Sequence, residues 1–167
     1  ERFENQNIRF FTEPNNADEE GNLINGNAFW FESGSAKDAD FSAIGYYFAN
    51  ALQPFSNVPV GIISCSKGAS RVDAWTSPEY VNTAEYQKMQ TAKHNDYFVY
   101  KFNHNSWLYK NKLLNIVPFA NSGVLWYQGE SNAFGTQEYY DIALNIYIEQ
   151  CRKMFDNEQL SFTICEL

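Results

Sequence analysis

Residues 58–70 read VPVGIISCSKGAS, an apolar run that leads directly into a loop of small and polar residues. The apolar part, residues 58–64, is rich in β-branched side chains, which is typical of a strand buried on both faces in a parallel sheet. In sheets of that kind, ligands bind outside the carboxyl ends of the strands. We therefore expect the loop at residues 64–70 to lie where a ligand would bind.

A second strand of this type is predicted at residues 123–127, which read GVLWY. It is followed by residues 128–132, QGESN, which carry amide, carboxylate and hydroxyl side chains. Both polar loops thus follow the carboxyl end of a predicted strand, where ligands bind in parallel α/β sheets. This coincidence is the main indication of a functional site.

Strand-like and helix-like patterns alternate along the rest of the chain, which favours an α/β fold. Further strands are expected at residues 7–12 and 160–165. An amphipathic helix is predicted over residues 41–52, with Asp40 or Ser42 as its cap. Its expected apolar face consists of Phe41, Ile44, Phe48 and Leu52.

The last helix is predicted to begin with Thr136 as its cap and to pack on the sheet through a stripe at helical spacing. The stripe consists of Tyr140, Leu144, Tyr147, Ile148, Cys151, Met154 and Phe155. Residues 107–117 predict another helix, closed by Pro118. Residues 78–105 predict short helices and loops over the sheet.

Residues 14–27 read as a polar loop, and residues 28–31 as a short aromatic stretch after it. No linker, repeat or low-complexity tract divides the chain. We therefore expect one domain over residues 1–167, a three-layer α/β/α sandwich with a mainly parallel sheet.

The charge balance excludes some classes of partner. The chain has 12 basic and 20 acidic residues and a net charge of −8, which disfavours nucleic acid and anionic membranes. No apolar run approaches the roughly 18 residues of a membrane span. The 3 cysteines and 2 histidines show no metal-ligand spacing, so free thiols and no metal are expected. Aromatic residues make up 17% of the chain, which suits core packing first and sugar stacking second.

Several interpretations of the two loops follow from chemistry alone. The amide of Gln128 could donate to an oxyanion, or residues 128–132 could form a polar turn that satisfies its own backbone. Ser66 resembles a nucleophile elbow, except that Ser64 stands where a glycine is needed. Ser64 and Lys67 match the Ser-x-x-Lys pattern of β-lactamases. Gly68 could instead expose its backbone N–H as an oxyanion donor, and a plain strand-to-helix turn is compatible with each of these.

Longer matches point to one family. Residues 124–133, VLWYQGESNA, resemble the WYQGESN signature of sialate O-acetylesterases and related acetylxylan esterases. Residues 61–75, GIISCSKGASRVDAW, are similar to the family's block GLISSSWGGTPIEAW, and residues 41–49, FSAIGYYFA, resemble its block FSAVGYFFG. The likeness extends over nearly the whole chain.

The resemblance implies an SGNH hydrolase with a flavodoxin-like fold, in which a serine attacks an acetyl ester on a sugar and a histidine acts as base. Carried over by position, Gly68 would supply a backbone N–H and Gln128 a side-chain amide to the oxyanion. Glu130 would be the acid that orients the histidine, while Ser131 and Asn132 would shape the substrate pocket. Such a reaction needs no cofactor and no metal.

The departures from the family are equally clear. The family's nucleophile motif Gly-Gln-Ser and its Asp-x-x-His motif do not occur in the sequence. Lys67 replaces a tryptophan, and Ala69 replaces the second glycine of the oxyanion loop. We therefore expect a chain truncated at both ends, which alone releases no acetate and exposes strand edges that favour dimers.

Two other functions stay open. The chain could be a non-catalytic module that binds a glycan or a protein partner, or a hydrolase that uses Ser66. An acetylated carbohydrate is the expected substrate, and a secreted or periplasmic location is what the resemblance suggests.

Overall fold

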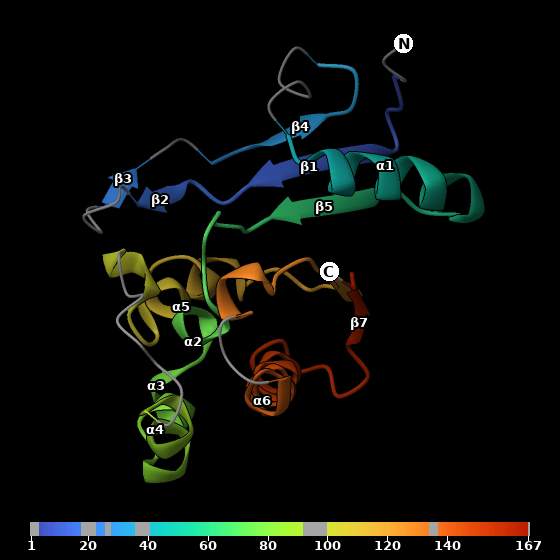
Figure 1. Ribbon diagram of the computed structural model, residues 1–167. Coiled ribbons are helices and arrows are strands. Elements are labelled where there is room, and N and C mark those ends of the chain that lie inside the picture. Colours follow the sequence, from blue (N-terminus) through green and yellow to red (C-terminus); the bar gives the residue numbers. More distant parts are fainter. Residues whose placement is uncertain are drawn as a thin grey trace. The chain divides into compact units, whose positions relative to one another are not determined.

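The computed structural model describes residues 4–17, 23–25, 28–35, 41–91, 100–133 and 137–166. The chain forms two compact units, which are described separately. Unit 1 comprises residues 1–15 and 25–66, and unit 2 comprises residues 16–24 and 67–167. Figure 1 labels most of their longer helices and strands.

The sheet of unit 1 is centred on β1 (Ile8–Thr12). On one side β1 pairs in parallel with β5 (Val60–Ser64), and on the other it pairs antiparallel with β4 (Trp30–Glu32). The strands predicted at 7–12 and 58–64 are therefore confirmed, with slightly shorter bounds. The aromatic stretch at 28–31 leads into β4, which was too short for its periodicity to predict.

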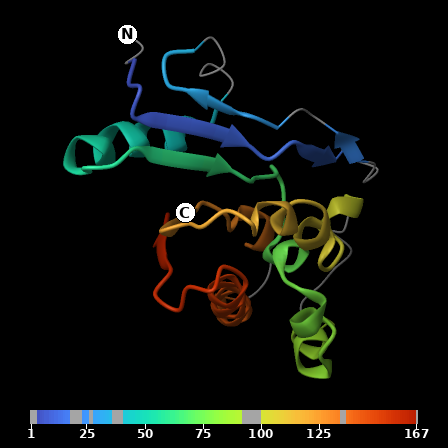
Figure 2. The same ribbon diagram turned by 180° about the vertical axis from the view of Figure 1, so that it is seen from behind.

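Helix α1 (Ala43–Leu52) lies along one face of this sheet, as Figures 1 and 2 show from opposite sides. The Ser42 side chain caps the helix by accepting a hydrogen bond from the N–H of Gly45 at 3.3 Å. Of the two caps considered, Ser42 is confirmed, and Asp40 lies outside the described residues.

The buried face of α1 differs from the predicted one. Gly45 and Ala49 are its buried residues, whereas Ile44 and Leu52 are each 42% exposed. A methyl group at Gly45 would lie only 3.0 Å from Ile62 Cγ2, so the helix approaches β5 closely along its small residues. The close approach of the α1 backbone to β5 therefore decided which face of the helix is buried. The spacing of apolar residues in the sequence carries no information about such an approach. Of the predicted face, Phe41 is buried, at 8% exposure.

The core of unit 1 forms between α1 and the sheet. Its fully packed members are Ile8, Phe10, Phe41 and Ala49, and the rings of Phe10 and Phe41 lie 4.4 Å apart. The apolar run of β5 predicted a strand buried on both faces. In the structure β5 is half-buried instead. Its Gly61 lies close to the Trp30 ring, where an added methyl group would come within 3.2 Å.

Unit 2 contains β6 (Gly123–Trp126) and β7 (Ser161–Ile164), which pair in parallel from Gly123 opposite Ser161 to Trp126 opposite Ile164. Both strands were predicted. Helix α6 (Gln137–Met154) follows β6 in the chain, and its Tyr147 ring packs on Trp126 at 4.4 Å.

The buried stripe of α6 is displaced from the predicted one at its start. Its buried members are Tyr139, Ala143, Tyr147, Gln150 and Cys151. Tyr140 and Leu144, which were predicted to face the core, are half-buried. Tyr139 is turned inward because its hydroxyl reaches a buried carboxylate, described below. The predicted cap, Thr136, lies outside the described residues.

Short helices make up most of the remaining described chain of unit 2. They are α2 (Val72–Trp75), α3 (Pro78–Val81), α4 (Ala84–Thr91), η3 (Lys101–Asn103), α5 (Trp107–Asn111), η4 (Leu113–Ile116) and η5 (Glu130–Asn132). The helix predicted over 107–117 is interrupted at Lys112, whose φ is −128°. α2 contacts both α5 and α6. A further single turn, η2 (Gln53–Phe55), follows α1 in unit 1.

Two further strands lie in the segment predicted as a loop. β2 (Asn15–Ala17) and β3 (Leu23–Asn25) pair with each other. The described strands thus form three sheets, with β5 and β6 in different ones. The α/β class is confirmed by the parallel pairs, whereas the single sheet in three layers stays a prediction.

Candidate functional site

The turn after β5 has an unusual backbone at Ala69. Its φ is +59°, in the left-handed region that L residues other than glycine rarely adopt. Gly68, the residue before it, is exposed, and an added methyl group there would meet nothing within 4 Å. The turn therefore presents Gly68 to open space.

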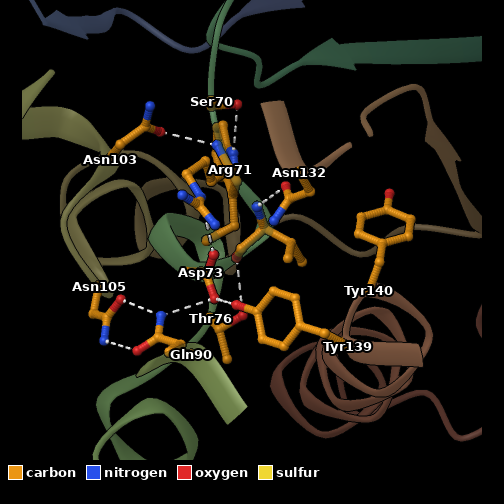
Figure 3. Close-up of polar contacts among 12 residues, drawn as sticks. Ser70, Arg71, Asp73, Thr76, Gln90, Asn103, Asn105, Asn132, Tyr139 and Tyr140 are labelled. Carbon is orange, nitrogen blue, oxygen red and sulfur yellow. Dashed lines mark hydrogen bonds and ion pairs between the residues drawn. The ribbon is translucent and has the colours of Figure 1, made fainter. Parts of the chain in front are cut away.

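Asn103 of η3 holds this turn from one side. Its Nδ2 donates to the main-chain oxygen of Ala69 at 2.8 Å, and its Oδ1 accepts from the N–H of Arg71 at 2.9 Å. Figure 3 shows the Asn103 side chain directed toward Arg71. The amide thus bonds to backbone groups on both sides of Ser70.

Gln128, two residues beyond the last residue of β6, holds the turn from the other loop. Its Nε2 donates to the main-chain oxygen of Ser70 at 2.9 Å and to Oδ1 of Asn132 at 2.7 Å. The hydroxyl of Tyr140 lies 3.0 Å from Gln128 Oε1 and 2.6 Å from its main-chain oxygen. Both amide hydrogens of Gln128 therefore already have acceptors within the protein.

Asn132 lies behind the surface, at 3% exposure. Its Oδ1 accepts from the N–H of Val72 at 3.1 Å as well as from Gln128. In Figure 3, Asn103 and Asn132 approach the segment around Arg71 from opposite sides. Within the described part of the chain, the Nδ2 of Asn132 has no hydrogen-bond partner.

A buried carboxylate anchors the helix that follows the turn. Asp73, fully buried in α2, accepts hydrogen bonds at Oδ1 from Tyr86, Gln90 and Tyr139, the first two at 3.0 and 2.9 Å. Its Oδ2 forms an ion pair with Arg71 Nε at 3.4 Å. Figure 3 shows Gln90 of α4 and Tyr139 of α6 directed toward Asp73.

The surroundings of Asp73 also shift the pKa of the two tyrosines that donate to it, Tyr86 and Tyr139. Burial, and next the negative charge of Asp73, raise the pKa of Tyr86 and that of Tyr139 above the ordinary range of a phenol. Both hydroxyls therefore stay protonated and donate to the carboxylate. The side-chain amides of Gln90 and Asn105 donate to each other, at 2.8 and 2.9 Å, and these two bonds hold Gln90 in place.

The bonds from Gln128 to Ser70 and from Val72 to Asn132 join residues 70–72 to the loop after β6. Glu130 is exposed and Ser131 is half-buried, both in η5. Ser66 is exposed and belongs to unit 1. His104 is exposed at the end of η3, and His94 lies outside the described residues.

Sequence reasoning did not single out Asn103, Tyr140 or Asp73 as site residues. Asp73 stands within the block that resembles the family, which was a usable signal. Asn103 is 32 residues from its partner Arg71, and no signal in the sequence indicated its role. Among the described residues, no group of three or more His, Cys, Asp or Glu side chains could hold a metal ion.

A family model described as carbohydrate esterase, sialic acid-specific acetylesterase, matches residues 31–167. The chain belongs to this family.

Individual proteins that are similar to this carbohydrate esterase chain are named as acetylesterases too. Sialate O-acetylesterases from Pongo abelii and Homo sapiens are each 26% identical to it over 114 residues. A crystal structure of a carbohydrate acetylesterase from Xanthomonas citri is 25% identical, covers 95% of this chain and gives a TM-score of 0.72. The chain corresponds to 21% of the length of the curated relatives and 34% of that solved chain.

The turn at Ala69 falls within the block that resembles the family. The family block quoted above has glycine at this position, and the φ of +59° is one that glycine adopts without strain. In this chain an alanine adopts that φ, and Asn103 donates to its main-chain oxygen. No helix among the described residues is long and apolar enough to cross a membrane.

Proposed function

We propose that this chain forms the oxyanion-binding part of a carbohydrate O-acetylesterase, which removes acetyl groups from sugars by acyl transfer through a serine. The observation that carries the proposal is the 2.9 Å bond from Gln128 Nε2 to the main-chain oxygen of Ser70. It ties together the two strand-end loops and leaves Gly68 exposed beside them. Family membership supports the reaction class.

Gly68 is the proposed backbone donor. Hydrolysis of an ester places negative charge on the carbonyl oxygen in the transition state, and a fixed N–H in open space stabilises that charge without reorganisation. The space around Gly68 suits this role, since no neighbouring atom would contact a substituent on its Cα.

Gln128 is the proposed second donor. Because Ser70 and Asn132 already accept its two amide hydrogens, donation to an oxyanion would replace one of these bonds. The bond to Asn132 is the one that can be exchanged without releasing the turn that carries Gly68. Tyr140 holds the Oε1 end of the same amide by donating to it at 3.0 Å.

The remaining proposed roles concern residues 130–132. Glu130, exposed in η5, would orient the histidine base. Ser131 is half-buried and would line the substrate pocket, while the buried Asn132 would support that wall from behind.

The nucleophile and the base are proposed to lie in flanking sequence. Neither Gly-Gln-Ser nor Asp-x-x-His occurs in the 167 residues, and the chain spans only 34% of the solved relative. Removing the serine or the histidine of a triad costs about 10⁶ in rate. We therefore expect the isolated chain to release no acetate above background.

The proposed substrate is an acetylated sugar, with 9-O-acetylated sialic acid first and acetylated xylan second. No cofactor or metal is required for this chemistry. Self-association is also proposed, because β5 pairs only with β1 among the described strands and Phe55 is 88% exposed. A monodisperse monomer in light scattering would contradict self-association.

The test uses the full-length protein, meaning this chain with the sequence that flanks it naturally. Gly68→Pro removes the backbone N–H, and acetate release from acetylated sialic acid should fall by about 10²- to 10³-fold in kcat. Gly68→Ala is the matched control, because it keeps the N–H and its methyl group meets open space. Equal activity of the two variants would refute the oxyanion role.

Two other outcomes would point to the other functions considered. Saturable binding of the acetylated sugar without any turnover by the full-length protein would identify a binding module. Labelling of Ser66 by a fluorophosphonate probe would identify an unrelated serine hydrolase.

A further inference from the structure

Amide side chains bond to four backbone groups in succession along the turn that carries Gly68. Asn103 donates to the oxygen of Ala69 and accepts from the N–H of Arg71. Gln128 donates to the oxygen of Ser70, and Asn132 accepts from the N–H of Val72. We call these three side chains the amide clamp. Only Asn103 holds the turn at two points.

The clamp acts on the strained part of the turn. A left-handed L residue costs roughly 1–2 kcal/mol, and Ala69 has a φ of +59°. Asn103 bonds to the carbonyl of this residue at 2.8 Å and to the N–H two residues later at 2.9 Å. A rotation of Ala69 back to a relaxed φ would turn its carbonyl and break the first of these bonds.

Relaxation of Ala69 would also disturb Gly68. The peptide plane that joins Gly68 to Ala69 turns about the N–Cα bond of Ala69, so its orientation relative to the held Ala69 carbonyl depends on φ of Ala69, and the Gly68 N–H lies one residue further along the chain. Gly68 itself has no packing that would hold it, since it is exposed and borders open space. Its orientation therefore depends on its neighbours in the chain, of which Lys67 lies over the Phe102 ring and Ala69 is held by Asn103.

We propose that Asn103 is a positioning residue, which fixes the orientation of the Gly68 N–H through Ala69. This inference rests on the proposed oxyanion role of Gly68. At 3% exposure, Asn103 lies behind the turn and acts on the substrate only through it.

The primary variant is Asn103→Asp in the full-length protein. The carboxylate keeps an acceptor for the N–H of Arg71 but places a second oxygen against the oxygen of Ala69. We expect kcat for acetate release to fall by about 10- to 100-fold with KM nearly unchanged, as for a misplaced catalytic group. Asn50→Asp is the matched control, because Asn50 also donates to one backbone carbonyl, that of Tyr46, but in α1.

A second readout follows the turn directly. In a protein labelled with ¹⁵N-glycine, the Gly68 amide signal is identified by its loss in Gly68→Ala. In Asn103→Asp this signal should shift and its hydrogen exchange should accelerate at pH 7. Both should return toward wild type as the pH falls, because a protonated carboxyl can donate to Ala69 again.

The possible results separate the two claims. If Gly68→Pro leaves kcat unchanged, the oxyanion role fails, whatever Asn103 does. If Gly68→Pro abolishes activity but Asn103→Asp alters neither kcat nor the Gly68 signal, the positioning role alone fails. If Asn103→Asp and Asn103→Ala both unfold the protein, Asn103 is a folding residue and the proposal is overturned.

Discussion

The hydroxyl of Tyr140 lies 2.6 Å from the main-chain oxygen of Gln128, to which it donates a hydrogen bond. The same hydroxyl accepts from Trp126 Nε1 at 3.1 Å. One phenol on α6 therefore links the last residue of β6 to the loop that begins the candidate site. Burial raises the pKa of Tyr140, so the group remains a donor at neutral pH.

Tyr140→Phe should destabilise the protein, because it leaves Trp126 Nε1 without its acceptor and removes the donor to Gln128. We expect a loss of about 1–2 kcal/mol in the free energy of unfolding, measured by urea denaturation. Tyr47→Phe is the control, since Tyr47 is 70% exposed, and it should change stability by less than about 0.5 kcal/mol. Equal effects of the two variants would show that the Tyr140 bonds contribute nothing.

Ala69→Gly should stabilise the protein. Glycine removes the strain at φ +59°, and the gain exceeds its larger backbone entropy in the unfolded chain. We expect a net gain of about 0.5–1 kcal/mol in thermal or urea unfolding. Ala133→Gly should have the opposite sign, because Ala133 has a φ of −62° that alanine adopts freely. A destabilising Ala69→Gly would contradict the left-handed conformation.

Asp73→Asn should be strongly destabilising. The change removes the charge that faces Arg71 Nε at 3.4 Å and weakens an acceptor that serves three buried donors. Breaking a buried ion pair typically costs about 3–5 kcal/mol. Glu32→Gln, in the exposed pair with Arg9 at 3.0 Å, should cost at most about 1 kcal/mol. A loss below that of Glu32→Gln would mean that the buried carboxylate does not anchor α2.

Alkaline pH should destabilise the fold. Burial raises the pKa of Cys151 to about 12, and it raises the pKa of Tyr86 and Tyr139 as well. Above about pH 9 the unfolded chain loses these protons while the folded chain keeps them, so the unfolded state gains stability as the pH rises. Urea midpoints should therefore fall between pH 8 and pH 11. A midpoint that stays constant over this range would contradict the burial of these groups.

The cysteines should differ in reactivity. Cys151 is 1% exposed with a raised pKa, whereas Cys165 is exposed. Iodoacetamide at pH 8 should label Cys165 in the folded protein and Cys151 only after unfolding, because the thiolate is the reactive form. Mass spectrometry of the digested protein distinguishes the two sites. Labelling of both at one rate would show that α6 opens readily.

The apolar runs of the sequence were sufficient to predict β1, β5, β6 and β7, since a strand or a helix is specified by the spacing of neighbouring side chains. The same rule predicted α1 and α6 but misjudged their buried faces. In α1 the close approach of Gly45 to Ile62 decided the face, and in α6 the inward turn of Tyr139 toward Asp73 did. Both depend on a partner that is distant in the sequence.

The sequence by itself determined the family motif, the strand-end position of the two polar loops and the residues Gly68 and Gln128 within them. Only the tertiary structure decided that both amide hydrogens of Gln128 are engaged and that Asn103 closes on the turn at Ala69. The physical reason is the separation along the chain between the residues that interact. Backbone periodicity and motif spacing are local properties, whereas a side-chain hydrogen bond forms only where folding brings a donor within about 3 Å of an acceptor.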